Sequence, residues 1–225
     1  TGLDKVEKVV SLTRESADNK RMGDYLSFRG TWQDGAILVC EANNNAPRVY
    51  EFAVKDGKVA DAPVTYLIDE EARGKKGGIA GVFHVKDNQY IITNEGASAI
   101  VVTLEGGEAK YVADLDFSAF GVGNILRTPK FFSLNGKEYM AAIIGTYEGT
   151  QLVGTANLIV IEITNGDLLA SIAAATPENS HVKVIENCAA GNGFAGLDVL
   201  AQGETVYIGY GVINGEVGLI KFRNQ

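Results

Sequence analysis

A repeated series of short apolar segments constrains the fold of this chain more than any other feature. Four successive parts show the same order: a glycine-rich start, a first strand, a turn, a second strand, a polar loop and a third strand. Self-similarity of this kind is typical of repeat architectures. The expected strands lie at 25–28, 36–40, 48–52 and 64–68, then 78–83, 90–94, 99–104 and 110–114, then 125–134, 138–146, 157–163 and part of 169–185, and finally 194–200, 205–209 and 217–222.

Turn residues between these segments favour β-hairpins. Asp34-Gly35, Asp56-Gly57, Gly106-Gly107, Asn135-Gly136 and Asn165-Gly166 stand between apolar runs, where a tight hairpin needs residues that tolerate a positive φ. A helical period is nowhere sustained for about ten residues. The sequence therefore predicts one all-β domain over residues 1–225, a small β-propeller of about four four-stranded antiparallel blades.

The fourth part ends one strand short, and a spare strand is present at the other end of the chain. Residues 5–12, Lys-Val-Glu-Lys-Val-Val-Ser-Leu, form an isolated strand-like segment before the first glycine-rich start. We expect this N-terminal strand to join the last blade and close the ring, because closure hides strand edges that would otherwise pair with another chain.

Charge and composition exclude several classes of partner. The formal net charge is -8, which leaves no positive field to attract a nucleic-acid backbone. No stretch approaches the ~20 apolar residues that span a bilayer, so we expect no membrane insertion either. Cys40 and Cys188 are the only cysteines and show no metal-ligand spacing. We predict buried thiols and assign no metal ligand, and a bridge between the two cysteines stays open.

One segment of the second repeat resembles a known propeller repeat. Residues 90–102, Tyr-Ile-Ile-Thr-Asn-Glu-Gly-Ala-Ser-Ala-Ile-Val-Val, are similar to the Tyr-Val-Thr-Asn repeats of bacterial surface proteins and lactonase-like propellers. Residues 45–52 resemble NHL-type repeats. The chain departs from the sialidase propellers, because residues 27–32 lack the aspartate of the Asp-box, and it is too short for the seven blades of the lactonases.

The whole chain also resembles uncharacterised secreted or lipid-anchored propellers of Bacteroides-like gut bacteria, many of them associated with glycan capture. The resemblance implies an exported protein that is secreted, periplasmic or held at the cell surface. The first residue, Thr1, is not a methionine, which is consistent with either a trimmed chain or a mature secreted form. The partner that the resemblance implies is a glycan or a surface protein.

The loops at one face of a propeller are where a site is expected. The loops that lead into the first strands and the loops that join the second strands to the third converge there, and a rigid scaffold then aims their side chains. Amides, carboxylates and aromatic rings suit a neutral, hydroxyl-rich ligand, whereas asparagines are also common simply as turn residues. The candidate ligand-binding residues are Tyr25, Asn43, Asn44, Asn94, Glu95, Arg127, Tyr147, Glu148 and Phe194.

Catalysis is a second interpretation of the same loops. Glu95 and Glu148 could face one another across the mouth of the channel, where two carboxylates support acid and base chemistry or hold a calcium ion. His84 and His181 are far apart and have no matched nucleophile, so they indicate no triad. We assign no catalytic residue and no cofactor, with a structural calcium ion as the alternative. Trp32 is expected to be a partly buried packing residue.

Three functions follow, in order of preference. The first is a non-catalytic, exported binding module that captures a glycan or a protein on the loop face of the propeller. The second is a propeller hydrolase or lyase that acts on a sugar or a lactone with a carboxylate pair. The third is a structural propeller within a surface assembly. Fold alone does not separate them.

Overall fold

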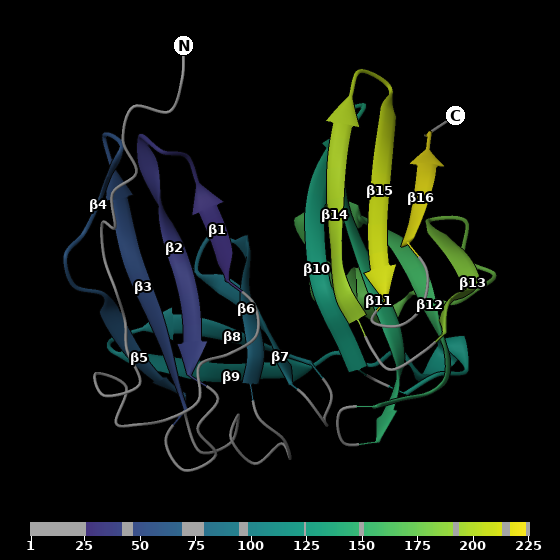
Figure 1. Ribbon diagram of the computed structural model, residues 1–225, viewed down its shortest axis with the longest axis horizontal. Coiled ribbons are helices and arrows are strands. Elements are labelled where there is room, and N and C mark those ends of the chain that lie inside the picture. The colour runs from purple at the N-terminus through teal and green to yellow at the C-terminus, as the bar shows by residue number, and fades with distance from the viewer. Residues whose placement is uncertain are drawn as a thin grey trace.

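The computed structural model describes residues 26–41, 47–68, 79–94, 99–123, 125–148, 151–190, 194–212 and 217–223. Over these residues the chain is nearly all β, as Figure 1 shows, and the all-β prediction is confirmed. Three helical turns interrupt the strands: η1 (Ser118–Phe120), η2 (Thr164–Gly166) and α2 (Leu168–Ala173). In the described ranges, no helix has the length and apolar character needed to cross a membrane.

The first two repeats form two antiparallel units. Unit 1 consists of β1 (Ser27–Gly30), β2 (Asp34–Glu41), β3 (Arg48–Lys55), β4 (Lys58–Val59) and β5 (Val64–Ile68). Unit 2 consists of β6 (Ile79–Lys86), β7 (Gln89–Asn94), β8 (Ile100–Glu105) and β9 (Glu108–Asp114). Paired strands within each unit are antiparallel, as predicted.

Units 1 and 2 share one sheet, which the repeat pattern did not predict. Their strands form a nine-stranded sheet in the order β1-β2-β3-β5-β9-β8-β7-β6, with β4 beside β3. The link is a short parallel pairing of the outermost strands, at Leu67 with Glu108 and at Ile68 with Ala109. Such a short contact between distant strands leaves no period in the sequence, so the sequence indicated separate sheets.

Unit 3 is the four-stranded antiparallel sheet that the sequence predicts, whereas unit 4 has three strands among the described residues. Unit 3 consists of β10 (Ile125–Leu134), β11 (Lys137–Glu148), β12 (Gln151–Ile163) and β13 (Val182–Ala190). Unit 4 consists of β14 (Phe194–Gln202), β15 (Thr205–Val212) and β16 (Val217–Phe222). Residues 5–12 lie outside the described residues, so closure of the ring by an N-terminal strand stays a prediction.

Three of the predicted turns have the expected backbone. Asp56 and Gly57 have φ values of 50° and 75°, and Asn135 and Gly136 have values of 52° and 76°. Gly106 and Gly107 also have positive φ values. Positive φ at both central residues matches the twist of the flanking strands, which is why these dipeptides mark the β3–β4, β10–β11 and β8–β9 hairpins.

The turn predicted at Asn165-Gly166 does not join two strands. Both residues have positive φ, but they end η2 and lead into the helix α2. The Asp167 carboxylate caps this helix by accepting a hydrogen bond from the Ala170 amide at 2.9 Å. The fourth strand of unit 3, predicted within 169–185, therefore begins only at Val182.

The segment between the strands predicted at 138–146 and 157–163 is mostly strand as well. β11 continues to Glu148 and pairs there with Gln151, the first residue of β12. A Cβ atom added at Gly145 would lie 2.9 Å from the Leu152 side chain. This glycine thus permits close packing of two strands.

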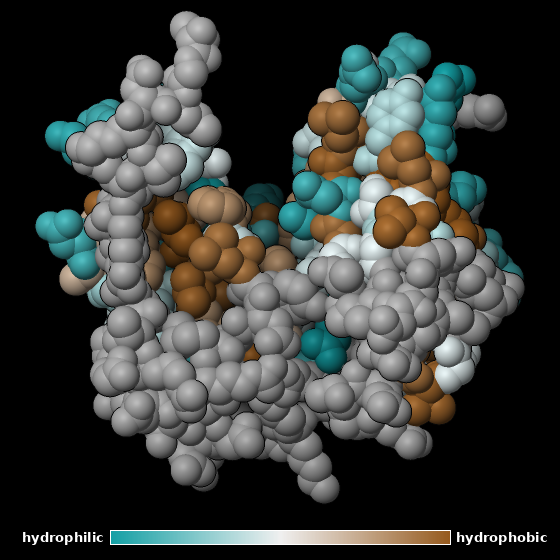
Figure 2. All heavy atoms as spheres, in the orientation of Figure 1, coloured by the Kyte–Doolittle hydropathy of each residue, from teal (hydrophilic) through white to brown (hydrophobic). Residues whose placement is uncertain are grey.

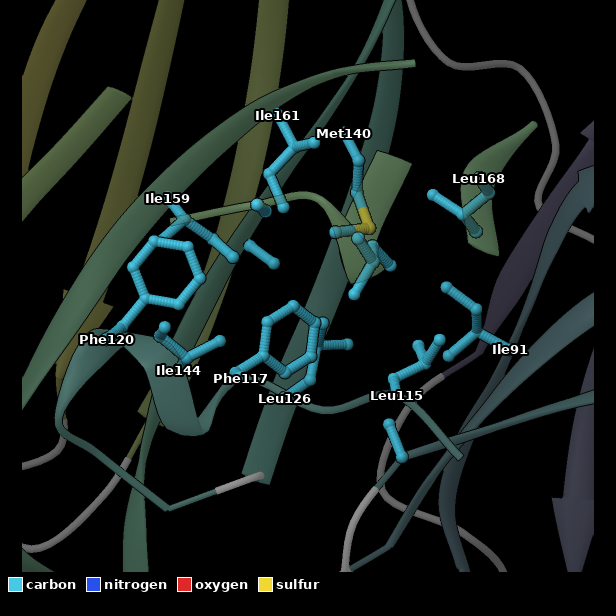
Figure 3. Packing of buried hydrophobic residues seen from close by; sticks show 14 of the residues in the cluster. Ile91, Leu115, Phe117, Phe120, Leu126, Met140, Ile144, Ile159, Ile161 and Leu168 are labelled. Carbon is cyan, nitrogen blue, oxygen red and sulfur yellow. The ribbon is translucent and has the colours of Figure 1, made fainter. Parts of the chain in front are cut away.

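Apolar side chains fill the interfaces between consecutive units. In β7, Ile92 belongs to the cluster between units 1 and 2, and its neighbour Ile91 belongs to the cluster between units 2 and 3. In β11, Ile144 faces unit 2 and Ile143 faces unit 4. Figure 3 shows Ile91 and Ile144 in the cluster between units 2 and 3. Each middle unit is therefore covered on both faces, as in a row of stacked blades.

The two end units flank a cleft. Figure 2 shows this cleft between unit 1 and unit 4 in the upper half of the view. Val217 and Leu219 on β16 are 88% and 73% exposed, and Phe28 on β1 is 62% exposed. Trp32, expected to be partly buried, is 57% exposed and lies with its ring centroid 6.4 Å from that of Phe28.

Candidate functional site

The second strands end and the first strands begin at one end of the units, which we call the mouth. The pairing of Ile79 with Asn94, of Ile125 with Gly145 and of Phe194 with Val212 sets this arrangement in units 2, 3 and 4. In Figure 1, the second strands of units 1 and 4, β2 and β15, both run toward the lower side of the molecule. The predicted site residues come from this end.

Five of the nine predicted site residues lie within the described part of the chain. Two have described side chains, namely Asn94 at the end of β7 and Arg127 in β10. Three have a described backbone only, at the ends of strands: Tyr147, Glu148 and Phe194. Four lie outside the described residues: Tyr25, Asn43, Asn44 and Glu95.

Asn94 and Arg127 lie within strands rather than in the loops expected from the sequence. Asn94 pairs with Ile79, and Arg127 pairs with Ile143. Both side chains are buried and both take part in polar or electrostatic interactions. Buried polar groups of this kind are held in fixed positions by their partners. The two residues therefore supply oriented amide and guanidinium groups near the mouth.

The backbone beside Arg127 is strained. Thr128 has a φ of 39°, a region that a β-branched residue rarely adopts. It lies in an irregularity of β10, where the register shifts between Arg127 and Lys130. Bulges of this type re-aim side chains and are frequent next to functional sites. The strain and the register shift thus mark the start of β10 as a candidate functional position.

A carboxylate is buried at the mouth end of unit 1. Glu41, the last residue of β2, is fully buried and accepts hydrogen bonds from the Tyr50 hydroxyl at 2.7 Å and from Arg48 Nη1 at 3.2 Å. Burial, together with the hydrogen bond to Glu41, raises the pKa of Tyr50 to about 12, so this phenol keeps its proton and its hydrogen bond further into alkaline pH than a free tyrosine would. The cluster fixes the ends of the two strands that flank residues 42–46.

Several buried polar groups near the mouth were missed from the sequence. Thr93 and Thr128 are buried, and their hydroxyls, like Glu41 Oε1, have no hydrogen-bond partner among the described residues. Asn157, on β12, is also buried, and it is engaged with a partner. Such groups are costly to bury. In the sequence, each of these residues is a polar residue within an otherwise apolar strand. The candidates were taken from loops, so these strand residues were not considered.

Comparisons with known proteins support the fold and leave the family open. No protein-family model matches the sequence, and a comparison with curated proteins also gives no match. The predicted likeness to Tyr-Val-Thr-Asn repeats therefore has no support from them.

The chain is similar in structure to a thermostable family-43 glycoside hydrolase, with a TM-score of 0.51 and 11% sequence identity. The similarity covers 89% of this chain and 68% of that chain. The hydrolase has a five-bladed β-propeller fold. At this level of identity the similarity concerns the fold alone, so the site has to be argued from the residues of this chain.

Proposed function

We propose that the chain acts on a carbohydrate held at the mouth, as a propeller hydrolase or lyase. The observation that carries the proposal is the strained position of Thr128 beside the buried Arg127. Backbone strain persists where the surrounding structure enforces it, and it clusters at functional sites. The likeness in fold to a glycoside hydrolase supports a sugar as the ligand.

The described polar groups at the mouth suit the hydroxyls of a sugar. The Arg127 guanidinium carries donors in a planar fork, and the amides of Asn94 and Asn157 both donate and accept. All three are buried and engaged within the chain, and in this proposal each shares its polar group with the ligand. A sugar hydroxyl also donates and accepts, so one hydroxyl pairs with either type of group. A neutral hydroxylated ring therefore fits this set of groups better than an apolar ligand does.

Two glutamates are the proposed acid and base. Glu148 is the last residue of β11, and Glu95 directly follows Asn94, the last residue of β7. In most glycoside hydrolases one carboxyl protonates the leaving group while a second acts as base or nucleophile, at a separation of about 5–5.5 Å or about 6.5–9.5 Å. A separation of these two carboxyl groups beyond about 10 Å would remove this version of the mechanism.

Capture without catalysis is the second candidate. It is favoured by the chemistry of Asn94 and Arg127, because an amide and a guanidinium bind hydroxyls without exchanging protons at neutral pH. In this version an exported protein holds a glycan or a surface protein at the mouth. A purely structural role in a surface assembly would need neither group to meet a ligand.

A panel of polysaccharides and aryl glycosides separates these candidates. We expect release of reducing ends from one class of substrate, and we expect Glu95→Gln and Glu148→Gln each to lower kcat by about 10²–10⁴-fold. Glu105→Gln is the matched control, because Glu105 is exposed at the far end of unit 2, in the β8–β9 hairpin. Its activity should stay within about twofold of the unaltered chain.

Binding measured on the same variants completes the test. A chain that binds a glycan saturably but releases no product, with unchanged affinity in both glutamine variants, would establish capture and exclude hydrolysis. Absence of both binding and turnover across the panel would exclude a carbohydrate function and leave the structural role. Arg127→Lys should weaken glycan binding whether the chain is a hydrolase or a capture module, since lysine lacks the planar guanidinium.

A further inference from the structure

A separate pocket lies on unit 3, at the end opposite the mouth. It forms where the chain leaves β12, passes through η2 and α2, and returns to begin β13, and its volume is ≈ 390 Å³. Small-molecule sites commonly measure about 300–1,000 Å³. We call it the α2 pocket, and the lining residues that matter here are Ile161, Glu162, Asn165, Asp167, Ala170 and His181.

One wall of the α2 pocket carries Glu162 and His181, and Lys137, which is not part of the lining, contacts Glu162. Glu162 Oε2 accepts a hydrogen bond from Lys137 Nζ at 3.0 Å and lies 3.3 Å from His181 Nδ1. Burial opposes ionisation of Glu162, but the hydrogen bonds from Lys137 and His181 outweigh it and lower the pKa of the carboxyl. Both contacts involve Oε2, so Oε1 has no partner among the described residues and can accept from a ligand.

The other wall carries an amide and a second carboxylate. Asp167 uses Oδ1 to cap α2, and its Oδ2 has no partner within the described chain. Asn165, held at a φ of 55°, adds an amide that both donates and accepts. Together with His181, the pocket therefore presents hydrogen-bonding groups of both kinds from two sides.

Internal hydrogen bonds hold these walls in place. Ser171 Oγ accepts from the Thr164 amide at 2.9 Å and donates to the Asp167 carbonyl at 2.6 Å. Asn179 donates to the Ala174 carbonyl at 2.8 Å and accepts from the His181 amide at 2.9 Å. Walls that are already ordered lose little entropy when a ligand binds.

The floor and the charges restrict the kind of ligand. Ile161 and Val182 are buried, and Ala170 adds only a methyl group, so the floor is apolar and leaves room above it. Lys137 balances the charge of Glu162, and the Asp167 carboxylate has no cation beside it among the described residues, so the lining offers no net positive charge to a phosphate or another anion. An apolar floor with mixed donors and acceptors at the rim fits the C–H face and the hydroxyls of a small neutral ring.

We propose that the α2 pocket is a second ligand site, separate from the mouth, that binds a neutral polyhydroxylated molecule of monosaccharide or disaccharide size. The proposal does not depend on the function proposed for the mouth. It adds a binding site on the opposite end of unit 3.

An NMR titration of the full chain with glucose, galactose, xylose, arabinose and myo-inositol tests the site, with inorganic phosphate as the charged comparison. We expect saturable binding of at least one neutral ligand. Ala170→Leu should weaken it at least tenfold by filling the pocket, and Glu162→Gln at least fivefold. Ala173→Leu is the matched control, since Ala173 is an exposed residue of the same helix outside the pocket lining, and it should change the affinity less than twofold.

The outcomes separate this site from the mouth. Binding that survives Ala170→Leu but is lost in Arg127→Lys would assign the ligand to the mouth and overturn the second site. Binding of phosphate alone, or of no neutral ligand, would also overturn it. Melting temperatures of the variants show whether each one folds, and loss in Ala170→Leu with a melting temperature equal to that of Ala173→Leu supports the site.

Discussion

Units 2 and 3 and the two end units are built from the same kind of strand but differ in what covers them. In the middle units, Ile91 and Ile144 are completely buried because a neighbouring unit packs on each face. On the end units, Val217 and Leu219 of β16 and Phe28 of β1 are mostly exposed. Alternation of apolar residues thus predicts a strand equally well in both places, and only the neighbour decides burial.

The end units expose large apolar side chains on strands with an uncovered face. Large exposed apolar patches on soluble proteins usually mark an interaction, and β16 is also an edge strand of a three-stranded sheet in the described chain. We therefore expect the end units to be the adaptable part of the fold and the middle units to be its stable part.

The largest expected difference between covered and uncovered surfaces comes from replacing a phenylalanine by alanine in each. Phe117 is fully buried between units 2 and 3, so Phe117→Ala should lower the free energy of unfolding by about 3–5 kcal/mol. Phe28→Ala removes the same atoms from an exposed position and should change it by no more than about 0.5 kcal/mol. Urea denaturation followed by circular dichroism measures both. Similar losses in the two variants would mean that Phe28 is covered in solution.

The N-terminal strand predicted for unit 4 gives the next largest effect. If residues 5–12 pair with β16, deletion of residues 1–12 should cost about 1–3 kcal/mol of stability and expose the edge of β16. Exposed edges promote pairing between chains, so sedimentation should show self-association of the shortened chain. Leu219→Lys in the shortened chain should suppress that association. A shortened chain that is monomeric and equally stable would rule out the pairing.

Much of the strand pattern was predictable because the strands carry their own signals. The segment predicted at 90–94 is β7 at 89–94, and the segment predicted at 217–222 is β16 itself. These segments are apolar runs bounded by turn residues, which is local information. The parallel contact of β5 with β9 and the helix α2 depend on distant packing and on one cap at Asp167, and the sequence pattern shows neither.

The site was predictable only in its location. Because strands alternate in direction, the ends of β7 and the start of β10 had to lie at the same end, which placed Asn94 and Arg127 together there. Their burial was not predictable, since it arises from packing between units. The strain at Thr128 was equally hidden, because a positive φ at a threonine has no sequence signature.

The smallest expected effect concerns Glu162, at the end of unit 3 opposite the mouth, as the pH is lowered. The pKa of Glu162 is lowered in the folded chain, because the hydrogen bonds from Lys137 and His181 outweigh the opposing effect of burial. Its contribution to stability is therefore present above the ordinary glutamate pKa and is lost as the pH falls through the folded value. For a largely surface ion pair we expect about 0.5 kcal/mol or less.

Urea denaturation at neutral and at acidic pH measures this loss. Glu162→Gln should flatten the pH dependence by that amount, because the amide does not titrate. Glu105→Gln is the control. Glu105 is well exposed and its Oε2 lies 3.8 Å from Lys110 Nζ, so we expect this variant to follow the pH dependence of stability of the unaltered chain. Parallel curves for the unaltered chain and Glu162→Gln would show that the contact with Lys137 and His181 does not persist in solution. The strand ends of a covered unit would then behave like the open surface of the end units.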